Sequence, residues 1–187
     1  DWRFETSFGY PGFINYGRNY AGARDEYVYV HSSDCDSAYL AADQMILARV
    51  TREHIMDRGS FTFYAGLKDD QPQWSAHIAE RAPIFRNPGH CSRSSITYNA
   101  GLGRYLWWQV LTIGQEPGPR FCGGFAIYDA PEPWGPWTTV YSSEQWDIGP
   151  GEMGSFCSRW MSEDGKDCAL ISSGNDYFSV RKLHLCC

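Results

Sequence analysis

The chain has 187 residues, a formal net charge of −6, and aromatic residues at 16% of its positions. An acidic chain without a block of Lys or Arg is not expected to bind nucleic acid. No apolar run approaches the roughly 20 residues that a membrane-spanning helix needs, so we expect no membrane segment.

Glycine and proline punctuate the whole sequence. There are 19 Gly and 10 Pro, and they are spread out rather than clustered. This spacing, with aromatic and β-branched residues in between, is typical of many short strands joined by turns. The chain begins at Asp1 without an initiator Met or a leader, and we interpret it as a processed protein or a piece of a longer one.

An imperfect internal repeat organises the sequence. The first copy is NYAGARDEYVYVHSS from Asn19, and the second is NAGLGRYLWWQVL from Asn99. Both have an Asn, an Ala-Gly pair, a short turn and an aromatic-rich strand. A shorter third copy, RWMSEDGKDCALISSG from Arg159, has Asp164 and Gly165 at its turn. Asp-Gly is a strong hairpin signal, and we interpret Asp164 as a structural turn residue.

The segments that follow each copy also correspond. Alternating strands are predicted at QMILARV from Gln44, GFAIYDA from Gly124 and YFSVRKL from Tyr177. A further strand follows the first two copies, at FTFYAG from Phe61 and WTTVYSS from Trp137. The order strand, hairpin, strand, loop, strand, loop, strand is that of one propeller blade.

We therefore predict an all-β fold, a β-propeller with about three four-stranded antiparallel blades. Residues 1–187 form a single propeller domain or a portion of one, with blades at about residues 10–80, 90–146 and 150–187. A closed propeller needs at least about four blades. We thus expect either missing N-terminal blades or a homo-oligomer in which two chains complete one propeller. A β-sandwich is the alternative fold.

Three connecting segments do not follow the strand pattern. VTREHIMDRG from Val50 predicts a short surface helix between strands. Residues 67–87 and 113–121 predict long irregular loops at blade edges. Loops on a rigid scaffold are where binding residues tend to lie.

Several segments resemble one family of secreted proteins. They are FINYGRNYAGARDEYVYV from Phe13, RSSITYNAGLGRYLWW from Arg93, FAIYDAPEPWGPWTTVY from Phe125 and EQWDIGPGEMGSFCSRWMSEDGK from Glu144. They are similar to the C-terminal part of a five-bladed propeller family, long classed as a domain of unknown function, that includes endo-D-arabinanase-type glycoside hydrolases. The resemblance implies a glycan site in a central funnel and an acid/base pair of carboxylates, which in the family lies nearer the N-terminus.

Glycoside hydrolysis requires two carboxyl groups that face each other across a sugar. Asp25, before the first repeat's strand, and Glu144, after the second blade, are the candidate catalytic residues in this chain. Glu26, Asp34, Asp36 and Asp147 are further carboxylates beside predicted strands. The alternative is that each caps a turn through Asx hydrogen bonds and that the true pair lies outside this chain.

Sugar binding requires flat aromatic faces beside polar groups. Trp107 and Trp108 are adjacent on one strand and point to opposite faces, so one is core and the other, which we take as Trp108, is free to stack on a sugar. The further candidate substrate-binding residues are Arg18, Asn19, His31, Arg93, Tyr98 and Asn99. The alternative role for the aromatic residues is packing between blades.

The seven cysteines show no C-x-x-C pair, so they predict disulfides rather than a metal site, with at least one thiol left over. A cluster of His184 with Cys186 and Cys187 is the alternative metal site. We expect no cofactor and no metal, and an extracellular, secreted protein.

These patterns predict a secreted carbohydrate-active propeller whose partner is a polysaccharide or other glycan. The first hypothesis is a glycoside hydrolase of the arabinan or furanoside type that acts through a carboxylate pair. The alternative is a non-catalytic glycan-binding protein of lectin type, or a structural secreted protein that assembles with itself.

Overall fold

The computed structural model describes residues 4–5, 7–112, 123–146, 151–174 and 177–186. Among these residues, every regular element is a β-strand or a three-residue 3-10 turn. The turns are η1 (Arg18–Tyr20), η2 (Arg52–His54), η3 (Arg58–Ser60), η4 (Ile78–Glu80) and η6 (Ser158–Trp160). The all-β prediction is confirmed.

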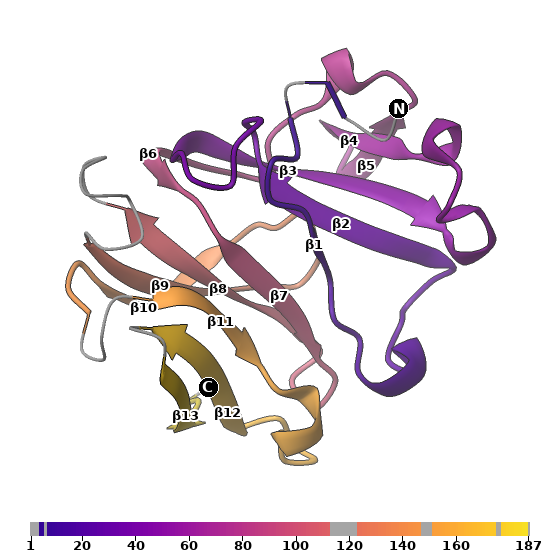
Figure 1. The fold of residues 1–187 in the computed structure, drawn as a ribbon. Coiled ribbons are helices and arrows are strands. Elements are labelled where there is room, and N and C mark those ends of the chain that lie inside the picture. The colour runs from indigo at the N-terminus through magenta and orange to yellow at the C-terminus, as the bar shows by residue number, and fades with distance from the viewer. Residues whose placement is uncertain (1–3, 6, 113–122, 147–150, 175–176, 187) are drawn as a thin grey trace.

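The strands form three antiparallel sheets (Figure 1). The first sheet contains β1 (Gly12–Phe13), β2 (Tyr27–Ser33), β3 (Ala42–Thr51), β4 (Thr62–Lys68) and β5 (Gln71–Ser75), with β6 (Phe85–Cys91) paired to β3. The second contains β7 (Ser94–Asn99), β8 (Arg104–Thr112), β9 (Gly123–Ala130) and β10 (Thr138–Ser143). The third contains β11 (Gly151–Phe156), β12 (Asp167–Gly174) and β13 (Tyr177–His184).

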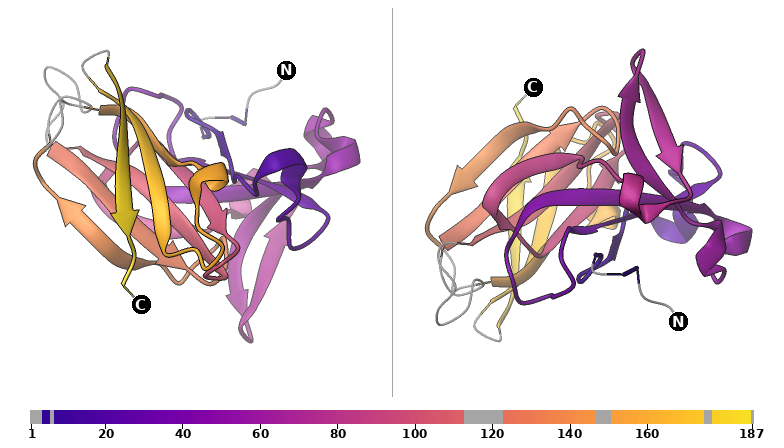
Figure 2. Two further views of the ribbon diagram at one scale, coloured as in Figure 1. Left: turned by 90° about the horizontal axis from the view of Figure 1, so that it is seen from below. Right: turned by 90° about the horizontal axis from the view of Figure 1, so that it is seen from above.

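One strand from each sheet lies along a common axis, and we call β1, β7 and β11 the axial strands. The segment after β1 is parallel to β7, since Asn15 pairs with Thr97 and the Asn15 backbone N–H donates to the Ile96 carbonyl at 2.9 Å. On the other side of β7, the Ser95 hydroxyl donates to the Gly154 carbonyl of β11 at 2.6 Å. The second sheet lies between the other two (Figure 2). The sheets fan out from shared inner strands, as blades do, and are not the two stacked layers of a sandwich.

Alternation along β8 builds the core on both sides of the second sheet. Trp107 and Trp108 point to opposite faces and are both fully buried. Trp107 lies in one core cluster with its ring 5.1 Å from that of Phe85 in the first sheet, and Trp108 lies in a second cluster with Phe156 of the third. Gly154 is required beneath the second indole, because a Cβ there would lie 2.6 Å from the Trp108 ring. Each indole therefore joins one pair of neighbouring sheets.

The first sheet is larger than predicted, with six strands rather than four. Residues 67–87, which we predicted to be irregular, contain the end of the β4–β5 hairpin and the start of β6. The hairpin turns at Asp69 and Asp70, which both have positive φ, as a type I′ turn requires. This turn has Asp69-Asp70 in place of the Asn-Gly or Asp-Gly pair that usually marks a type I′ turn. This explains why the hairpin was missed.

Two other segments complete the comparison with the predicted elements. The predicted surface helix after Val50 is a pair of 3-10 turns, η2 and η3. The second turn is capped by Asp57, whose carboxylate accepts the Gly59 backbone N–H. The loop predicted at residues 113–121 lies outside the described residues.

The disulfide prediction is not supported for the cysteines that the structure describes. Cys35, Cys91, Cys157, Cys168 and Cys186 are all unpaired. Cys91 and Cys168 are buried in different core clusters, on either side of the second sheet. The packing therefore holds these two thiols apart as small core residues.

Candidate functional site

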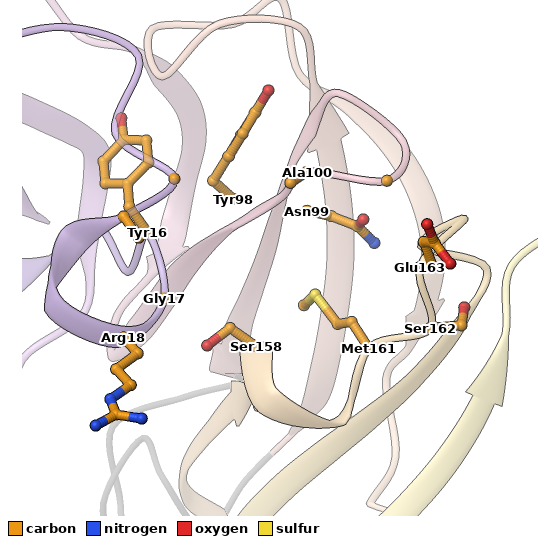
Figure 3. Close-up of a pocket in the computed structure, with 13 residues that line it drawn as sticks. Tyr16, Gly17, Arg18, Tyr98, Asn99, Ala100, Ser158, Met161, Ser162 and Glu163 are labelled. Atoms are coloured by element: carbon orange, nitrogen blue, oxygen red, sulfur yellow. The ribbon is translucent and has the colours of Figure 1, made fainter.

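A cavity of about 330 Å³ opens where the three sheets meet, at the C-terminal ends of the axial strands (Figure 3). We call this place the C-terminal axial end. The cavity is lined by Tyr16, Gly17, Arg18, Ala21, Gly22, Tyr98, Asn99, Ala100, Gly101, Ser158, Met161, Ser162 and Glu163. Each sheet contributes one segment of the wall, so the cavity exists only because the sheets share an axis.

The first wall is the segment that leaves β1. The Asn15 side chain accepts the Gly17 backbone N–H at 2.8 Å and turns the chain into η1, which carries Arg18. Gly17 has φ +82, a conformation that favours glycine. Tyr16 is buried, and its hydroxyl lies 3.0 Å from that of Tyr105. Burial raises the pKa of Tyr16 far above its ordinary value, so it is a neutral hydrogen-bonding group.

The second wall is the end of β7. Tyr98 is half-buried, with its ring 5.7 Å from Tyr16 and 5.0 Å from Tyr105 between centroids. The Arg24 guanidinium lies 5.9 Å from the Tyr98 ring and forms an ion pair with Glu132. These contacts fix the Tyr98 ring at the cavity edge, where Figure 3 shows it beside Tyr16.

Asn99 holds the second and third walls together. It is fully buried, its amide nitrogen donates to the Gly165 carbonyl at 2.8 Å, and its amide oxygen accepts the Leu102 backbone N–H at 3.2 Å. Gly101 packs so closely on the neighbouring turn that a Cβ there would lie 2.3 Å from the Gly165 nitrogen. Both ends of the Asn99 amide are thus used in positioning the walls.

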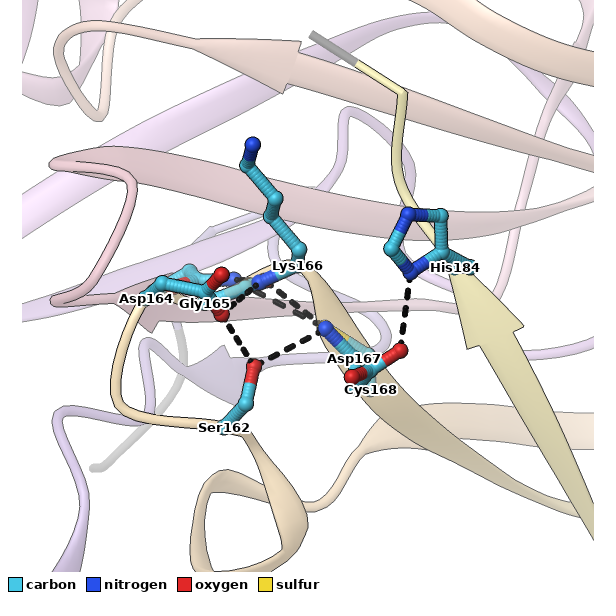
Figure 4. A network of polar contacts seen from close by, with 8 residues as sticks. Ser162, Asp164, Gly165, Lys166, Asp167, Cys168 and His184 are labelled. Carbon is cyan, nitrogen blue, oxygen red and sulfur yellow. Dashed lines mark hydrogen bonds and ion pairs between the residues drawn. The ribbon is translucent and has the colours of Figure 1, made fainter.

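The third wall is the turn before β12, which Figure 4 shows as a polar network. The Ser162 hydroxyl and the Lys166 backbone N–H both donate to Asp164, at 2.6 and 3.1 Å. These hydrogen bonds hold the pKa of Asp164 below its ordinary value. The Asp167 backbone N–H donates back to Ser162 at 2.9 Å. This geometry agrees with the structural role predicted for Asp164, and the turn presents Glu163 to the cavity.

The lining combines aromatic, hydroxyl and charged side chains. It contains the rings of Tyr16 and Tyr98, the hydroxyls of Ser158 and Ser162 and the carboxylate of Glu163. Arg18 also lines it, with its guanidinium directed away from Tyr98 and Glu163 in Figure 3. Figure 3 places the Arg18 backbone and Tyr16 on one side and Glu163 with Ser162 on the other. Such a mixture of an aromatic surface and a few polar groups is typical of small-molecule sites.

Three of the predicted binding residues meet at this cavity: Arg18, Tyr98 and Asn99. Asn19 is exposed next to Arg18 in the left-handed region, at φ 54, but does not line the cavity. Tyr98 lines the cavity and its binding role stays a prediction, whereas both ends of the Asn99 side-chain amide bond to the protein. Glu163, Ser158 and Met161 were not predicted. The polar turn sequence before β12 was the one sequence signal for a site there, and we interpreted it only as a hairpin turn.

Two predicted binding residues lie at the opposite end of the axial strands. His31 is buried and pairs with Gly12, and its Nδ1 lies 3.3 Å from the Ser94 hydroxyl at the start of β7. Arg93 immediately precedes β7. His31 is a core residue without an open face, so its predicted contact with a sugar is wrong for this chain.

Trp108 requires a correction. It is 1% exposed and lies under Phe125, Trp146 and Gly154. We predicted that one of the two adjacent tryptophans is core and that the other is free to stack on a sugar, because adjacent side chains on a strand point to opposite faces. Here the second sheet is covered on both sides, so Trp108 has no face for a sugar.

Asp25 and Glu144 are not brought together. Asp25 accepts the Tyr27 backbone N–H and the Tyr29 hydroxyl, at 2.9 and 2.6 Å, next to Arg24 at the C-terminal axial end. Glu144 follows Ser143, which pairs with Phe125 at the other end of the second sheet. The two carboxylates therefore do not face each other across one site, and Asp25 serves as a turn cap.

Among the described residues, no three or more His, Cys, Asp or Glu side chains gather as a metal site. Within the same part of the chain, none of the helices has the length and apolar character required to cross a membrane.

The fold is shared with several solved structures. An exo-β-1,3-galactanase from Phanerochaete chrysosporium, solved with galactose, superposes with a TM-score of 0.54 at 11% identity, over 96% of this chain and 36% of that one. A putative exo-β-1,3-galactanase from Bifidobacterium bifidum gives 0.53 at 10% identity, over 94% and 50%. A putative hydrolase from Bacteroides ovatus gives 0.50 at 14% identity, over 87% and 37%.

These superpositions identify the class of fold. The chain forms part of a β-propeller, as predicted, and it spans between about a third and a half of the length of these structures. No family model matches the sequence, and the search of curated proteins found no match. At such low identities the likeness establishes the fold alone.

Proposed function

We propose that this chain is part of a carbohydrate-active propeller of the glycoside hydrolase type, and that its axial cavity binds a polysaccharide. The observation that carries the proposal is the cavity itself, where three blade-like sheets bring Tyr98, Arg18 and Glu163 around one opening. Its fold is that of structures described as galactanases and a hydrolase. Arabinan and related furanosides, predicted from sequence, and β-1,3-galactan are the first substrates to test.

In this proposal Glu163 is the carboxylate that this chain brings to the sugar. It is exposed at the cavity edge, next to a hydrogen-bonded turn that fixes its backbone. A hydrolase needs a second carboxylate about 5–10 Å away, depending on whether it retains or inverts the anomeric configuration. Since Glu163 is the one carboxylate among the described residues that line the cavity, the second would come from elsewhere in the complete propeller.

The single carboxylate also supports a second candidate function, a non-catalytic glycan-binding module. Such a module needs only the aromatic ring and the polar groups that orient a sugar. The two candidates differ in whether bonds are broken, and a single set of measurements separates them.

The experiment measures binding and hydrolysis with the same protein. Arabinan, β-1,3-galactan and an unrelated glucan are titrated by calorimetry, and released oligosaccharides are followed by chromatography. Binding with release of sugars supports the hydrolase, and binding without release supports the module. Absence of binding to every polymer would overturn the proposal.

Two matched variants locate the site. Glu163→Gln removes the charge and keeps the shape, and we expect it to weaken glycan binding about tenfold, as loss of a charged hydrogen bond does. Glu53→Gln is the control, since Glu53 is an exposed glutamate in η2, which does not contribute to the cavity. Equal affinities for both variants would place the site elsewhere.

We also propose that the protein is secreted, because its polymeric substrates occur outside cells. The unpaired cysteines provide a test. Thiol counting under denaturing, non-reducing conditions on protein from its natural source would show disulfides if the mature protein forms in an oxidising compartment. A full count of seven free thiols would contradict this part of the proposal.

A further inference from the structure

The opposite end of the axial strands carries a second group of residues, which the cavity does not use. Tyr10 precedes β1, Arg93 precedes β7, and the loop of residues 34–40 follows β2. We call this place the N-terminal axial end. Arg93 was predicted to bind substrate, and here it organises two aromatic rings.

The loop of residues 34–40 is anchored at its start and again just before Tyr39. At its start, the Asp34 carboxylate accepts hydrogen bonds from Ser7, Gln44 and Arg81 at 2.6–3.0 Å. In its later part, the Arg93 Nε donates to the Ala38 carbonyl at 3.2 Å. The backbone is therefore fixed on the N-terminal side of Tyr39.

A close backbone contact fixes the middle of the loop. The Gly9 backbone N–H donates to the Cys35 carbonyl at 2.7 Å. A Cβ on Gly9 would lie 2.4 Å from the Ser37 nitrogen, so only glycine allows the two segments to approach this closely. The segment that carries Tyr10 and the loop that carries Tyr39 are thereby held together.

Tyr39 is 67% exposed although the loop around it is held. The Arg93 guanidinium lies 5.3 Å from the Tyr39 ring centroid and 5.4 Å from that of Tyr10, within cation–π range of both. The guanidinium thus holds one side of the Tyr39 ring, while most of the ring's surface faces solvent. A preorganised, exposed ring is the element that binding sites for flat apolar faces use.

Carboxylates lie on the same two segments, at a cavity that Tyr39 and Tyr10 themselves do not line. A cavity of about 550 Å³ is lined by Gly9 and Pro11, which flank Tyr10 in sequence, and by the carboxylates of Glu5 and Asp36. Asp36 belongs to the same loop as Tyr39. Sugar hydroxyls donate hydrogen bonds, and carboxylates are acceptors for them.

From this arrangement we infer that the N-terminal axial end is a second carbohydrate-binding surface, on which a sugar ring stacks against Tyr39. Arg93 positions the ring, and Asp36, an exposed carboxylate three residues before Tyr39 in the same loop, accepts the hydroxyls. The inference rests on the proposed function for the class of ligand, but it concerns residues that are separate from the axial cavity.

The test compares variants of two tyrosines whose side chains are exposed to a similar degree. Tyr39→Ala removes the ring, Tyr39→Phe keeps it, and Tyr177→Ala removes a similarly exposed tyrosine, 74% accessible, from β13 of the third sheet. Affinity for arabinan and β-1,3-galactan is measured by calorimetry, and folding of each variant is checked by its thermal midpoint. We expect Tyr39→Ala to weaken binding about tenfold. We expect Tyr39→Phe and Tyr177→Ala to bind as the unchanged protein does.

The outcomes separate the two proposals. If Tyr39→Ala binds normally while Glu163→Gln is weakened, the second surface is overturned and the axial cavity stands. If Tyr39→Ala is weakened while Glu163→Gln binds normally, the second surface is supported and the axial cavity fails. If Tyr39→Phe loses as much affinity as Tyr39→Ala, stacking on the ring is overturned.

Discussion

The two ends of the axial strands are held in different ways. At the C-terminal axial end, turns from the second and third sheets are locked by close backbone contacts at Gly101 and Gly165 and by the Asn99 amide. At the N-terminal axial end, the contacts are an ion pair between Asp34 and Arg81 and a buried, neutral His31. The first kind of contact depends on shape, and the second depends on protonation. The same three strands therefore end in one site held mainly by the shape of the Gly101–Gly165 contact and one whose buried histidine and ion pair make its stability depend on pH.

The largest expected effect tests the steric lock. Gly165 has φ +75, and a Cβ there would lie 2.1 Å from the Asn99 amide oxygen. Gly165→Ala combines backbone strain with a clash in a buried contact, and we expect it to lower the free energy of unfolding by about 3 kcal/mol or more. Denaturant titration measures this.

Gly103 provides the matched control for the steric lock. It has φ +64, but nothing lies within 4 Å of the position of its Cβ. Gly103→Ala therefore reports backbone strain alone, about 1 kcal/mol. Equal losses at the two glycines would show that contact between the turns contributes little.

The second prediction concerns the loss of folding stability in acid that the buried His31 causes. Burial lowers the pKa of His31 to about 4 from its ordinary value of 6.5. The unfolded chain binds this proton near pH 6.5, whereas the folded protein does so only near pH 4, so acid favours unfolding between these values. The loss approaches roughly 3 kcal/mol at pH 4.

The slope of stability against pH isolates this histidine. His31→Asn is expected to flatten the slope between pH 6.5 and 4, whatever its effect on stability at pH 7. His77→Gln, at an exposed histidine before η4, serves as the control and is expected to leave the slope unchanged. An unaltered slope in His31→Asn would mean that another group carries the acid dependence.

The third prediction concerns the ion pair. Hydrogen bonds from Gln44, Ser7 and Arg81, together with the Arg81 charge, outweigh burial and hold the pKa of Asp34 below its ordinary value. Its stabilising contribution is thus present at neutral pH and is lost as the pH falls through the lowered pKa. Asp34→Asn is expected to cost about 2 kcal/mol at pH 7, because charged hydrogen bonds are lost. Asp70→Asn, in the exposed β4–β5 turn, should change stability by less than about 0.5 kcal/mol.

The smallest expected effect on stability is at the proposed ligand site. Glu163 is exposed, so Glu163→Gln should change the free energy of unfolding by less than about 0.5 kcal/mol. Its effect is expected in glycan affinity alone. A large loss of stability would indicate that Glu163 is part of the lock between the turns, and thermal unfolding of the variant decides this.

Local patterns were sufficient for much of the fold. The alternation in β2, β3, β8 and β9 and the internal repeat predicted strands at the positions where the structure has them. The Asp69–Asp70 hairpin was missed because its turn residues carry a weaker signal than Asn-Gly. Candidate residues at the end of β7 were predicted because the repeat placed Tyr98 and Asn99 at the end of an inner strand.

The sequence by itself determined that strands form and which residues of each strand share a face, because side chains alternate along an extended backbone. Only the tertiary structure decided which of those faces are covered. Both faces of the second sheet pack against neighbours, so Trp108 is core rather than a sugar platform. The same packing brings Glu163 to Tyr98 from 65 positions away in the sequence and leaves Asp25 and Glu144 apart. Contacts between blades depend on the shared axis, which no local pattern encodes.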